Sequence, residues 1–434
     1  MTPYGIPYWI ILVFLFLYGA VLGSFLNVCI YRIPQFATVR AAWAGLWNPP
    51  SRCPRCGRNI LLVDNIPIIG WLKLRGRCRF CRRRISVRYP LIELFNGLLF
   101  VALYWAEIPA GYLTTITDSG LYTPLGPRGV PGSFWFSDVA ILHWRYVYHG
   151  VMLEALLAAS FIDIDLRIIP DAVTIPAMLI GVLGAFAVGR VYLVPVWFQD
   201  PSLVSAAMKL LPTSWPLPLS TGAVPQWCRA HPHWHGLSVS VAGLLVGGGV
   251  VWLVRLLGFW ILRQEAMGFG DVILMAMIGS FVGWQPVLVV FFLAPVCALL
   301  AVAASVLVRR EREIPYGPYI SLATLLLLLA FQEIWPVAER IFSMGVLLIP
   351  LAATMVVLLV LSLAATQLAK RMLGIPLVPS DWDGWPEEPP TGGHLLESTA
   401  ADTSRWRPAE LDRWPGILAG RGELFSERWR RGSR

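Results

Sequence analysis

Residues 146–171 read YVYHGVMLEALLAASFIDIDLRIIPD, an apolar run that ends in a cluster of aspartates. The part from Tyr146 to Phe161 is apolar enough to enter a bilayer, and Glu154 is its only acidic residue. Asp163 follows at the boundary of this run. A carboxylate close to a membrane-spanning segment is costly to hold there, so it indicates a functional site. The stretch therefore predicts a membrane helix that delivers a functional aspartate to one face of the bilayer.

Apolar runs of this kind recur along most of the chain. Of its 434 residues, 56% are hydrophobic and 14% are charged, whereas soluble proteins carry about 25% charged residues. Since about 20 apolar residues cross a bilayer, we expect an all-α integral membrane fold, a polytopic bundle of about eight or nine transmembrane helices. The net charge of +9 does not indicate nucleic-acid binding, because basic loops that set membrane orientation explain it.

The basic residues also predict the orientation of the chain. No charged side chain precedes the first apolar run, whereas residues 51–89 contain eleven Lys and Arg residues and a single acid, Asp64. The positive-inside rule places this loop in the cytoplasm and the N-terminus outside. Because no basic segment precedes the first run, we expect a retained span and not a cleaved signal peptide. Alternation from this start brings Asp163 and Asp271 to the same, cytoplasmic, side.

The chain is expected to divide into five segments. They are a first span (1–32), a cytoplasmic four-cysteine loop (33–89), a core of further spans (90–336) with outer loops at 107–145 and 199–235, an additional span (337–371) and a cytoplasmic tail (372–434). The tail is charged, rich in Pro, Gly and Trp, and without periodicity, so it is expected to be mostly flexible.

Four of the seven cysteines form two close pairs, CPRC at 53–56 and CRFC at 78–81. Four thiolates with this spacing suit a closed, tetrahedral structural zinc site. Disulfides are uncommon in the cytoplasm, and nearby arginines favour the thiolate form. The alternative, four free surface thiols, leaves the paired spacing unexplained. The expected zinc ligands are Cys53, Cys56, Cys78 and Cys81.

A second aspartate, Asp271, ends the sequence MGFGD at 267–271. Gly268 and Gly270 permit close backbone approach, so that Asp271 can face a water-filled cavity. The alternative is a glycine-rich turn whose aspartate caps the following helix. Two carboxyls that share a site split their pKa values, so one serves as base while the other serves as acid. Such a pair is the minimum that an aspartic protease needs for catalysis.

Any of three aspartates in the first cluster could be the carboxyl that pairs with Asp271. Asp171 follows Pro170 and is expected to cap the next span. Asp165 points away from Asp163 on a helix, because residues two apart do not share a face. Asp163 lies closest to the end of the incoming span, so we rank it first and Asp165 second.

Taken together and in this order, the motifs resemble bacterial type IV prepilin peptidases, the leader peptidases of type IV pili and type II secretion. The resemblance covers about residues 8–335. Its motifs are GSFLNV at 23–28, YRIP at 31–34, the four-cysteine loop with NIP at 65–67 and LRG at 74–76, RYP at 88–90 with Glu93, the aspartate cluster at 163–171, GFGD at 268–271 and IPYGP at 314–318.

The resemblance implies a bacterial inner-membrane aspartic endopeptidase with Asp163 and Asp271 as its catalytic pair. It implies that prepilins or pseudopilins are cut after a glycine at the cytoplasmic face. It also implies that the new amino terminus is then methylated with S-adenosylmethionine, in a region expected near Gly23, Asn27 and Glu93. The expected partners are these substrates and membrane lipids, which the basic loop would contact; nucleic acid is not expected.

The chain departs from the family pattern at Ile273, where a lysine is usual. Its absence removes a cation that could depress the carboxyl pKa. The two outer loops are longer than the pattern requires, and residues 338–434 lie beyond it. Two other functions stay open from the residues alone. A proton-coupled transporter would need carboxylates near the bilayer midplane, and a non-enzymatic scaffold for pilus or secretion assembly would cut no leader peptide.

Overall fold

The computed structural model describes residues 7–36, 38–47, 50–53, 55–108, 138–200, 226–262, 267–307 and 315–373. Throughout these ranges the regular elements are helices, and the pairings Arg52–Asn59 and Arg77–Arg84 are isolated bridges. The expectations for most of the two outer loops and for the tail from residue 374 fall outside the described residues.

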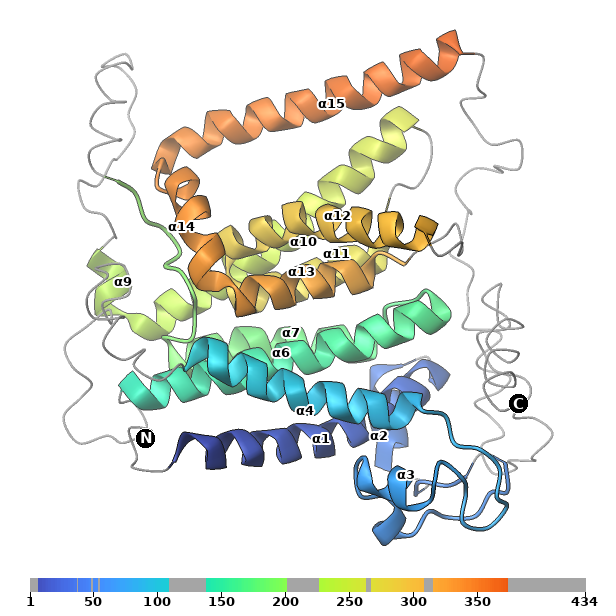
Figure 1. Ribbon diagram of the computed structural model, residues 1–434. Coiled ribbons are helices and arrows are strands. Elements are labelled where there is room, and N and C mark those ends of the chain that lie inside the picture. Colours follow the sequence, from blue (N-terminus) through green and yellow to red (C-terminus); the bar gives the residue numbers. More distant parts are fainter. Residues whose placement is uncertain are drawn as a thin grey trace, which may run out of the picture.

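The long helices lie side by side in one bundle (Figure 1). Among the described residues, seven helices are long and apolar enough to cross a membrane, and a bent pair makes an eighth candidate. The seven are α1 (Tyr8–Arg32), α4 (Arg88–Glu107), α6 (Asp138–Leu166), α7 (Asp171–Val188), α10 (Pro232–Leu262), α12 (Trp284–Leu307) and α15 (Leu348–Met372). These helices confirm the predicted polytopic bundle.

A short helix, α11 (Phe269–Val282), lies at the centre of the bundle and packs along α10 and α7. Every residue from Leu274 to Val282 is buried. Its contact with α10 is made through two facing glycines, since a Cβ on Gly243 would lie 1.9 Å from the carbonyl oxygen of Gly279. Small residues at a helix interface allow such close backbone approach. The neighbouring helices therefore cover a segment that is too short to cross a bilayer alone.

Two spans end differently from the sequence expectation. The fourth was expected to continue to about residue 198, but α7 ends at Val188 because Gly189 adopts φ 79°, a left-handed helix cap. The eighth, expected over 319–334, is divided between α13 (Gly317–Leu329) and α14 (Phe331–Phe342), which meet at 96°.

Residues 190–200 cover the end of the bundle away from the four cysteines (Figure 1). The indole of Trp284 donates to the Val196 carbonyl at 2.6 Å, and the amide of Gln285 donates to the Pro195 carbonyl at 2.9 Å. Val194 in this segment is fully buried. The segment is therefore an integral part of the fold.

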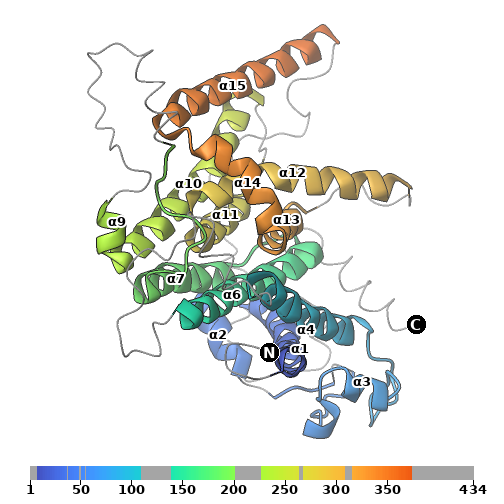
Figure 2. The same cartoon turned by 60° about the vertical axis from the view of Figure 1, so that its left-hand side comes forward.

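The opposite end of the bundle carries the four cysteines. There α1 and α6 end and α4, α7, α11 and α13 begin, so the ends of six helices gather on one side (Figure 1). The cysteine subdomain, residues 50–87, contains η2 (Leu62–Asp64) and α3 (Ile69–Lys73) and lies beside α1 and α4 (Figure 2). The additional helix α15 lies at the edge of the bundle, next to α10.

Candidate active site

Asp163 lies in the last turn of α6 and is 6% exposed. The backbone N–H of Gly317, at the start of α13, donates to its Oδ2 at 3.1 Å. The helix ends just beyond it, where Arg167 adopts φ 58° and its N–H donates to the Asp163 carbonyl at 2.8 Å. A left-handed residue at this position is a common way to end a helix. The backbone of Asp163 is thus held by its own helix end, and its carboxyl is held by the start of α13.

Asp271 lies in the first turn of α11, directly after the glycine motif, and is half-buried. Gly268 is the N-cap residue of α11 in extended conformation, and the Asp271 carboxyl accepts a hydrogen bond from its backbone. Asp271 is close enough to Asp163 for its negative charge to act on that carboxyl. The structure therefore brings the two aspartates, 108 residues apart in the numbering of the chain, into one site.

Ile169 lies between the two glycines that flank the aspartates. A Cβ on Gly270 would lie 3.1 Å from Cβ of Ile169. A Cβ on Gly317 would lie 3.3 Å from Cδ1 of Ile169 and 2.6 Å from Oδ2 of Asp163. A side chain at position 317 would therefore force its neighbour to move, and one at position 270 would need a small shift of Ile169. Three segments meet at Ile169: the turn after α6, the start of α11 and the start of α13. They can approach this closely because Gly270 and Gly317 have no side chains.

Tyr316 is a further polar residue of the site that reasoning on single residues did not identify. It is the half-buried N-cap residue of α13, and burial together with the charge of Asp271 raises its pKa to about 12. Its hydroxyl therefore keeps its proton at neutral pH and stays a hydrogen-bond donor. In the sequence, Tyr316 lies in the PYGP motif, which was identified only as part of the family resemblance.

The other two aspartates of the cluster lie apart from the pair. Both guanidinium nitrogens of Arg88 reach the Asp165 carboxylate, Nη1 to Oδ1 at 2.9 Å and Nη2 to Oδ2 at 2.6 Å. Asp171 is the exposed first residue of α7. It was expected to cap this helix, but Pro170 occupies the N-cap position and no side chain caps that end. An acidic side chain in the first turn still interacts favourably with the positive end of the helix dipole.

The position where a lysine is usual is Ile273, half-buried on α11. Its side chain carries no charge, yet the site does not lack a cation. Arg167, in the turn after α6, is close enough for its charge to act on Asp163. A positive charge thus reaches the aspartate pair from another element.

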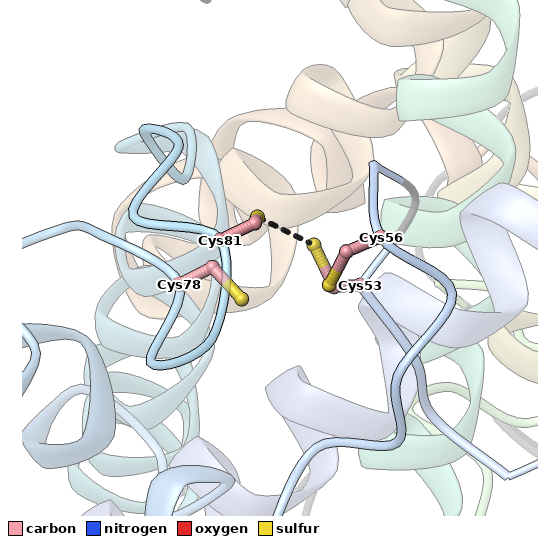
Figure 3. A group of neighbouring side chains, drawn as sticks. All are labelled: Cys53, Cys56, Cys78 and Cys81. Atoms are coloured by element: carbon pink, nitrogen blue, oxygen red, sulfur yellow. Dashed lines mark hydrogen bonds between the residues drawn. The ribbon is translucent and has the colours of Figure 1, made fainter.

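The four cysteines converge at one point (Figure 3). Their Sγ atoms all lie within 4.8 Å of one another, and those of Cys53 and Cys81 are 3.9 Å apart. Four thiolates around zinc at 2.3 Å in a tetrahedron would be separated by about 3.8 Å. The donor set therefore fits a metal ion. Among the described residues it is the one group of three or more His, Cys, Asp or Glu side chains placed to hold one.

Each cysteine pair lies in the same kind of turn. The N–H of Cys53 donates to the Arg58 carbonyl and that of Cys78 donates to the Arg83 carbonyl, both at 2.9 Å. The second turn is bound to η2 through Asp64, whose carboxylate accepts from Nε and Nη2 of Arg79 at 2.6 and 2.5 Å. This ion pair holds the second turn against the segment between the two pairs.

The three residues expected near methyl transfer lie on the contact between α1 and α4. A Cβ on Gly23 would lie 2.9 Å from Cα of Glu93, and the amide of Asn27 donates to the Tyr89 carbonyl at 3.2 Å. The buried carboxylate of Glu93 accepts from the N–H of Ile68 at 2.7 Å. The region is therefore continuous with the cysteine subdomain.

Comparison with known proteins identifies two matching family models. Residues 17–107 match the bacterial peptidase A24 N-terminal domain, and residues 206–304 match the type IV leader peptidase family. The first contains Gly23, Asn27 and the four cysteines, and the second contains Asp271 but not Asp163.

Several curated proteins are similar over most of their length. A prepilin leader peptidase/N-methyltransferase of Stutzerimonas stutzeri is 30% identical over 330 residues, which are 70% of this chain and 86% of that protein. A type 4 prepilin-like proteins leader peptide-processing enzyme of Escherichia coli O78:H11 is 30% identical, over 70% of this chain and 88% of that protein. A prepilin leader peptidase/N-methyltransferase of Klebsiella pneumoniae is 33% identical, over 63% and 85%. No solved structure matches the chain.

Proposed function

This chain belongs to the type IV leader peptidase family, and we propose that Asp163 and Asp271 are the residues with which it cuts leader peptides. It is a prepilin peptidase, and like the relatives named for both activities it methylates the amino terminus that cleavage exposes. The observation that carries the catalytic assignment is the meeting of two carboxyls from α6 and α11 at the helix ends beside the cysteine subdomain.

The proposed reaction is hydrolysis by a pair of carboxyls. One carboxylate takes a proton from a water molecule, whose oxygen attacks the scissile carbonyl carbon. The other, protonated, carboxyl donates a hydrogen bond to the carbonyl oxygen while it keeps its proton, and it transfers that proton to the leaving amine when the C–N bond breaks. The proton that the first carboxylate took from water then leaves the pair with one shared proton, as at the start. Two carboxyls this close do not readily ionise together, which keeps the required proton in the site. The Tyr316 hydroxyl is a donor within the same site.

The position of the pair argues against the transporter alternative. Asp163 lies in the last turn of α6 and Asp271 in the first turn of α11. Both are thus at the end of their helices and not near the middle of a span. The basic cysteine subdomain lies at the same end, so the positive-inside rule supports a site at the cytoplasmic face of the inner membrane. Substrates whose cleaved bond lies just outside the bilayer, after a glycine, suit this position.

For the four cysteines we propose zinc, bound as a closed structural site. All four positions would be filled by thiolates from Cys53, Cys56, Cys78 and Cys81, which leaves none for a substrate. The ion would hold the two turns together and thereby fix the segment between them. Its contribution is folding energy for the subdomain.

For methyl transfer we propose the region around Glu93, with S-adenosylmethionine as the source of the methyl group. The sulfonium of this cofactor is positive, and a buried carboxylate complements it. Gly23 and Asn27 already serve the packing of α1 on α4. We therefore assign to Glu93 the contact with S-adenosylmethionine. Gly23 and Asn27 would shape the region by holding α1 against α4.

The test uses purified protein in detergent and a prepilin-like substrate, with products weighed by mass spectrometry. Asp163→Asn and Asp271→Asn should each abolish cleavage, while Asp171→Asn, an exposed aspartate on the same segment, should cut normally. Glu93→Gln should cut the leader but should not add the methyl group of about 14 Da. Cleavage by either catalytic variant would overturn the assignment of the pair.

A further inference from the structure

The cysteine subdomain exposes a strip of apolar side chains between its two cysteine pairs. We call it the apolar strip, residues 61–72; its exposed members are Leu61, Leu62, Val63, Ile66, Ile69 and Leu72. Their exposed fractions run from 43% to 89%, the highest being that of Leu62. Six exposed aliphatic side chains within twelve residues are more than scattered single ones, and larger exposed apolar patches mark contacts with a membrane or a protein.

The segments that flank the strip in the chain are strongly positive. The exposed cations of the subdomain are Arg52, Arg55, Arg58, Lys73, Arg75, Arg77, Arg79, Arg82, Arg83 and Arg84. The single acid, Asp64, is paired with Arg79. Basic residues close to an anionic leaflet each contribute about 1 kcal/mol of attraction. Apolar side chains flanked by cations are typical of segments that lie in the headgroup region.

The position of the strip fits such a contact. α3, which carries Ile69 and Leu72, lies beside the ends of α1 and α4 on the outer flank of the bundle, and both views agree (Figures 1 and 2). The short helix α2 (Val39–Trp47) lies at the same end. It exposes Trp43 and Trp47, and tryptophan is enriched where a bilayer meets water. Two short helices therefore flank the spans at the level where headgroups surround them.

We propose that the apolar strip is embedded in the headgroup layer of an anionic leaflet, the one in which α1 ends and α4 begins. The six aliphatic side chains enter the acyl boundary, and the surrounding arginines bind phosphates. The strip is also joined firmly to the bundle, because the carboxylate of Glu93 on α4 accepts the N–H of Ile68 within it. The cysteine subdomain is thus held at a fixed height beside the aspartate pair.

Two other occupants are less compatible with these observations. A basic leader peptide would be repelled by the cations around the strip. A second copy of the chain would bring an identical basic surface against them, again with repulsion. A lipid surface, by contrast, supplies both the negative charge and the apolar layer.

The test places an environment-sensitive fluorescent amino acid at single positions of the full chain in nanodiscs. The discs contain phosphatidylcholine with or without phosphatidylglycerol, and include lipids brominated near the headgroup as quenchers. The probe replaces Leu62 in the strip and Phe14 on the exposed face of α1 as a membrane-embedded reference. It also replaces Arg55 at the first cysteine turn, as an exposed comparison among the cations. The quenching bromines lie on the acyl chains, below the phosphates. The zinc content of each variant confirms that the subdomain is folded.

We expect stronger quenching at Leu62, whose side chain enters the acyl boundary, than at Arg55, which lies among the phosphate-binding cations. Quenching at Leu62 should be stronger when phosphatidylglycerol is present and weaker at high salt. Leu62→Ala should keep the wild-type peptidase activity in detergent, so this readout is independent of the aspartate assignment. Failure of quenching at Leu62, with Phe14 quenched, would overturn the proposal. So would a signal at Leu62 that appears only with two copies per disc or only after substrate is added.

Discussion

Gly317→Ala tests whether the start of α13 sets the geometry of the aspartate pair. The added Cβ would lie 2.6 Å from Oδ2 of Asp163, whereas an ordinary van der Waals contact begins at 3.4 Å, so the carboxyl must move by about 0.8 Å. A misplacement of about 1 Å in an active site can cost about 100-fold in rate. We therefore expect kcat to fall by about 100-fold, which is about 2.7 kcal/mol of transition-state stabilisation.

The assay measures kcat and KM for leader cleavage in detergent, together with the thermal stability of the protein. KM should change little, because the added carbon contacts the Asp163 carboxyl and no substrate-binding surface needs to change. Gly249→Ala is the matched control, since that glycine is also helical and has nothing within 4 Å of its Cβ position. Gly270→Ala should lie between the two, because its nearest contact, 3.1 Å, is to the side chain of Ile169.

The order of the three variants decides the outcome. A kcat for Gly317→Ala within about threefold of the Gly249→Ala control would refute the reasoning, since it would mean that the carboxyl position is not critical. A loss of stability without any loss of kcat would assign Gly317 to packing alone. Overpacking typically costs about 1–3 kcal/mol, so the stability measurement can detect it.

Three further predictions concern the contacts around the site. Arg88→Ala should destabilise the fold by about 2 kcal/mol and lower cleavage, because it leaves the carboxylate of Asp165 half-buried and unpaired. Exchanging the two residues should restore part of the stability and part of the cleavage rate. An unchanged melting temperature for Arg88→Ala would contradict a stabilising role of this ion pair. Since Arg79 holds the pKa of Asp64 below its usual range, this pair's contribution is present at neutral pH and is lost only on acidification through the lowered pKa. Asp64→Asn should therefore speed metal release to a chelator equally from pH 6 to pH 8 in buffers without added zinc, and a difference confined to the upper end of that range would contradict this. Cys78→Ser should lower the bound zinc, measured by atomic emission, below one per chain, and stoichiometric zinc would exclude the four-thiolate site.

The sequence predicts the spans well because their signal is local. Apolar runs and the positions of basic residues lie within single segments, and the cysteine pairs carry their own spacing. Asp163 and Asp271 were also indicated by their own positions at the ends of apolar runs, and the order of motifs agreed with this choice. These are properties of short windows, and the bundle and the four-thiol cluster follow from them.

What the sequence does not reveal depends on tertiary contacts. Arg88 and Asp165 are 77 positions apart, and opposite charges at such a distance carry no pairing signal. The 96° bend between α13 and α14 lies within a chain that stays apolar through the first of them. The role of Ile169 follows only from the meeting of two glycines that are themselves far apart in the chain. The candidate functional residues can therefore be predicted from this sequence more readily than the tertiary contacts that hold them in place.

The covered end of the bundle has an energetic consequence for the cell. A hydrolase must admit water to its carboxyls, and in an energised membrane any continuous water file would carry protons down a gradient worth about 2.3 kcal/mol per charge for each 100 mV. Here the buried run from Leu274 to Val282 and the segment 190–200 lie between the aspartates and the far side. Buried residues along this route would oppose such a water file, and this would favour hydrolysis of a peptide bond at the membrane without loss of the gradient.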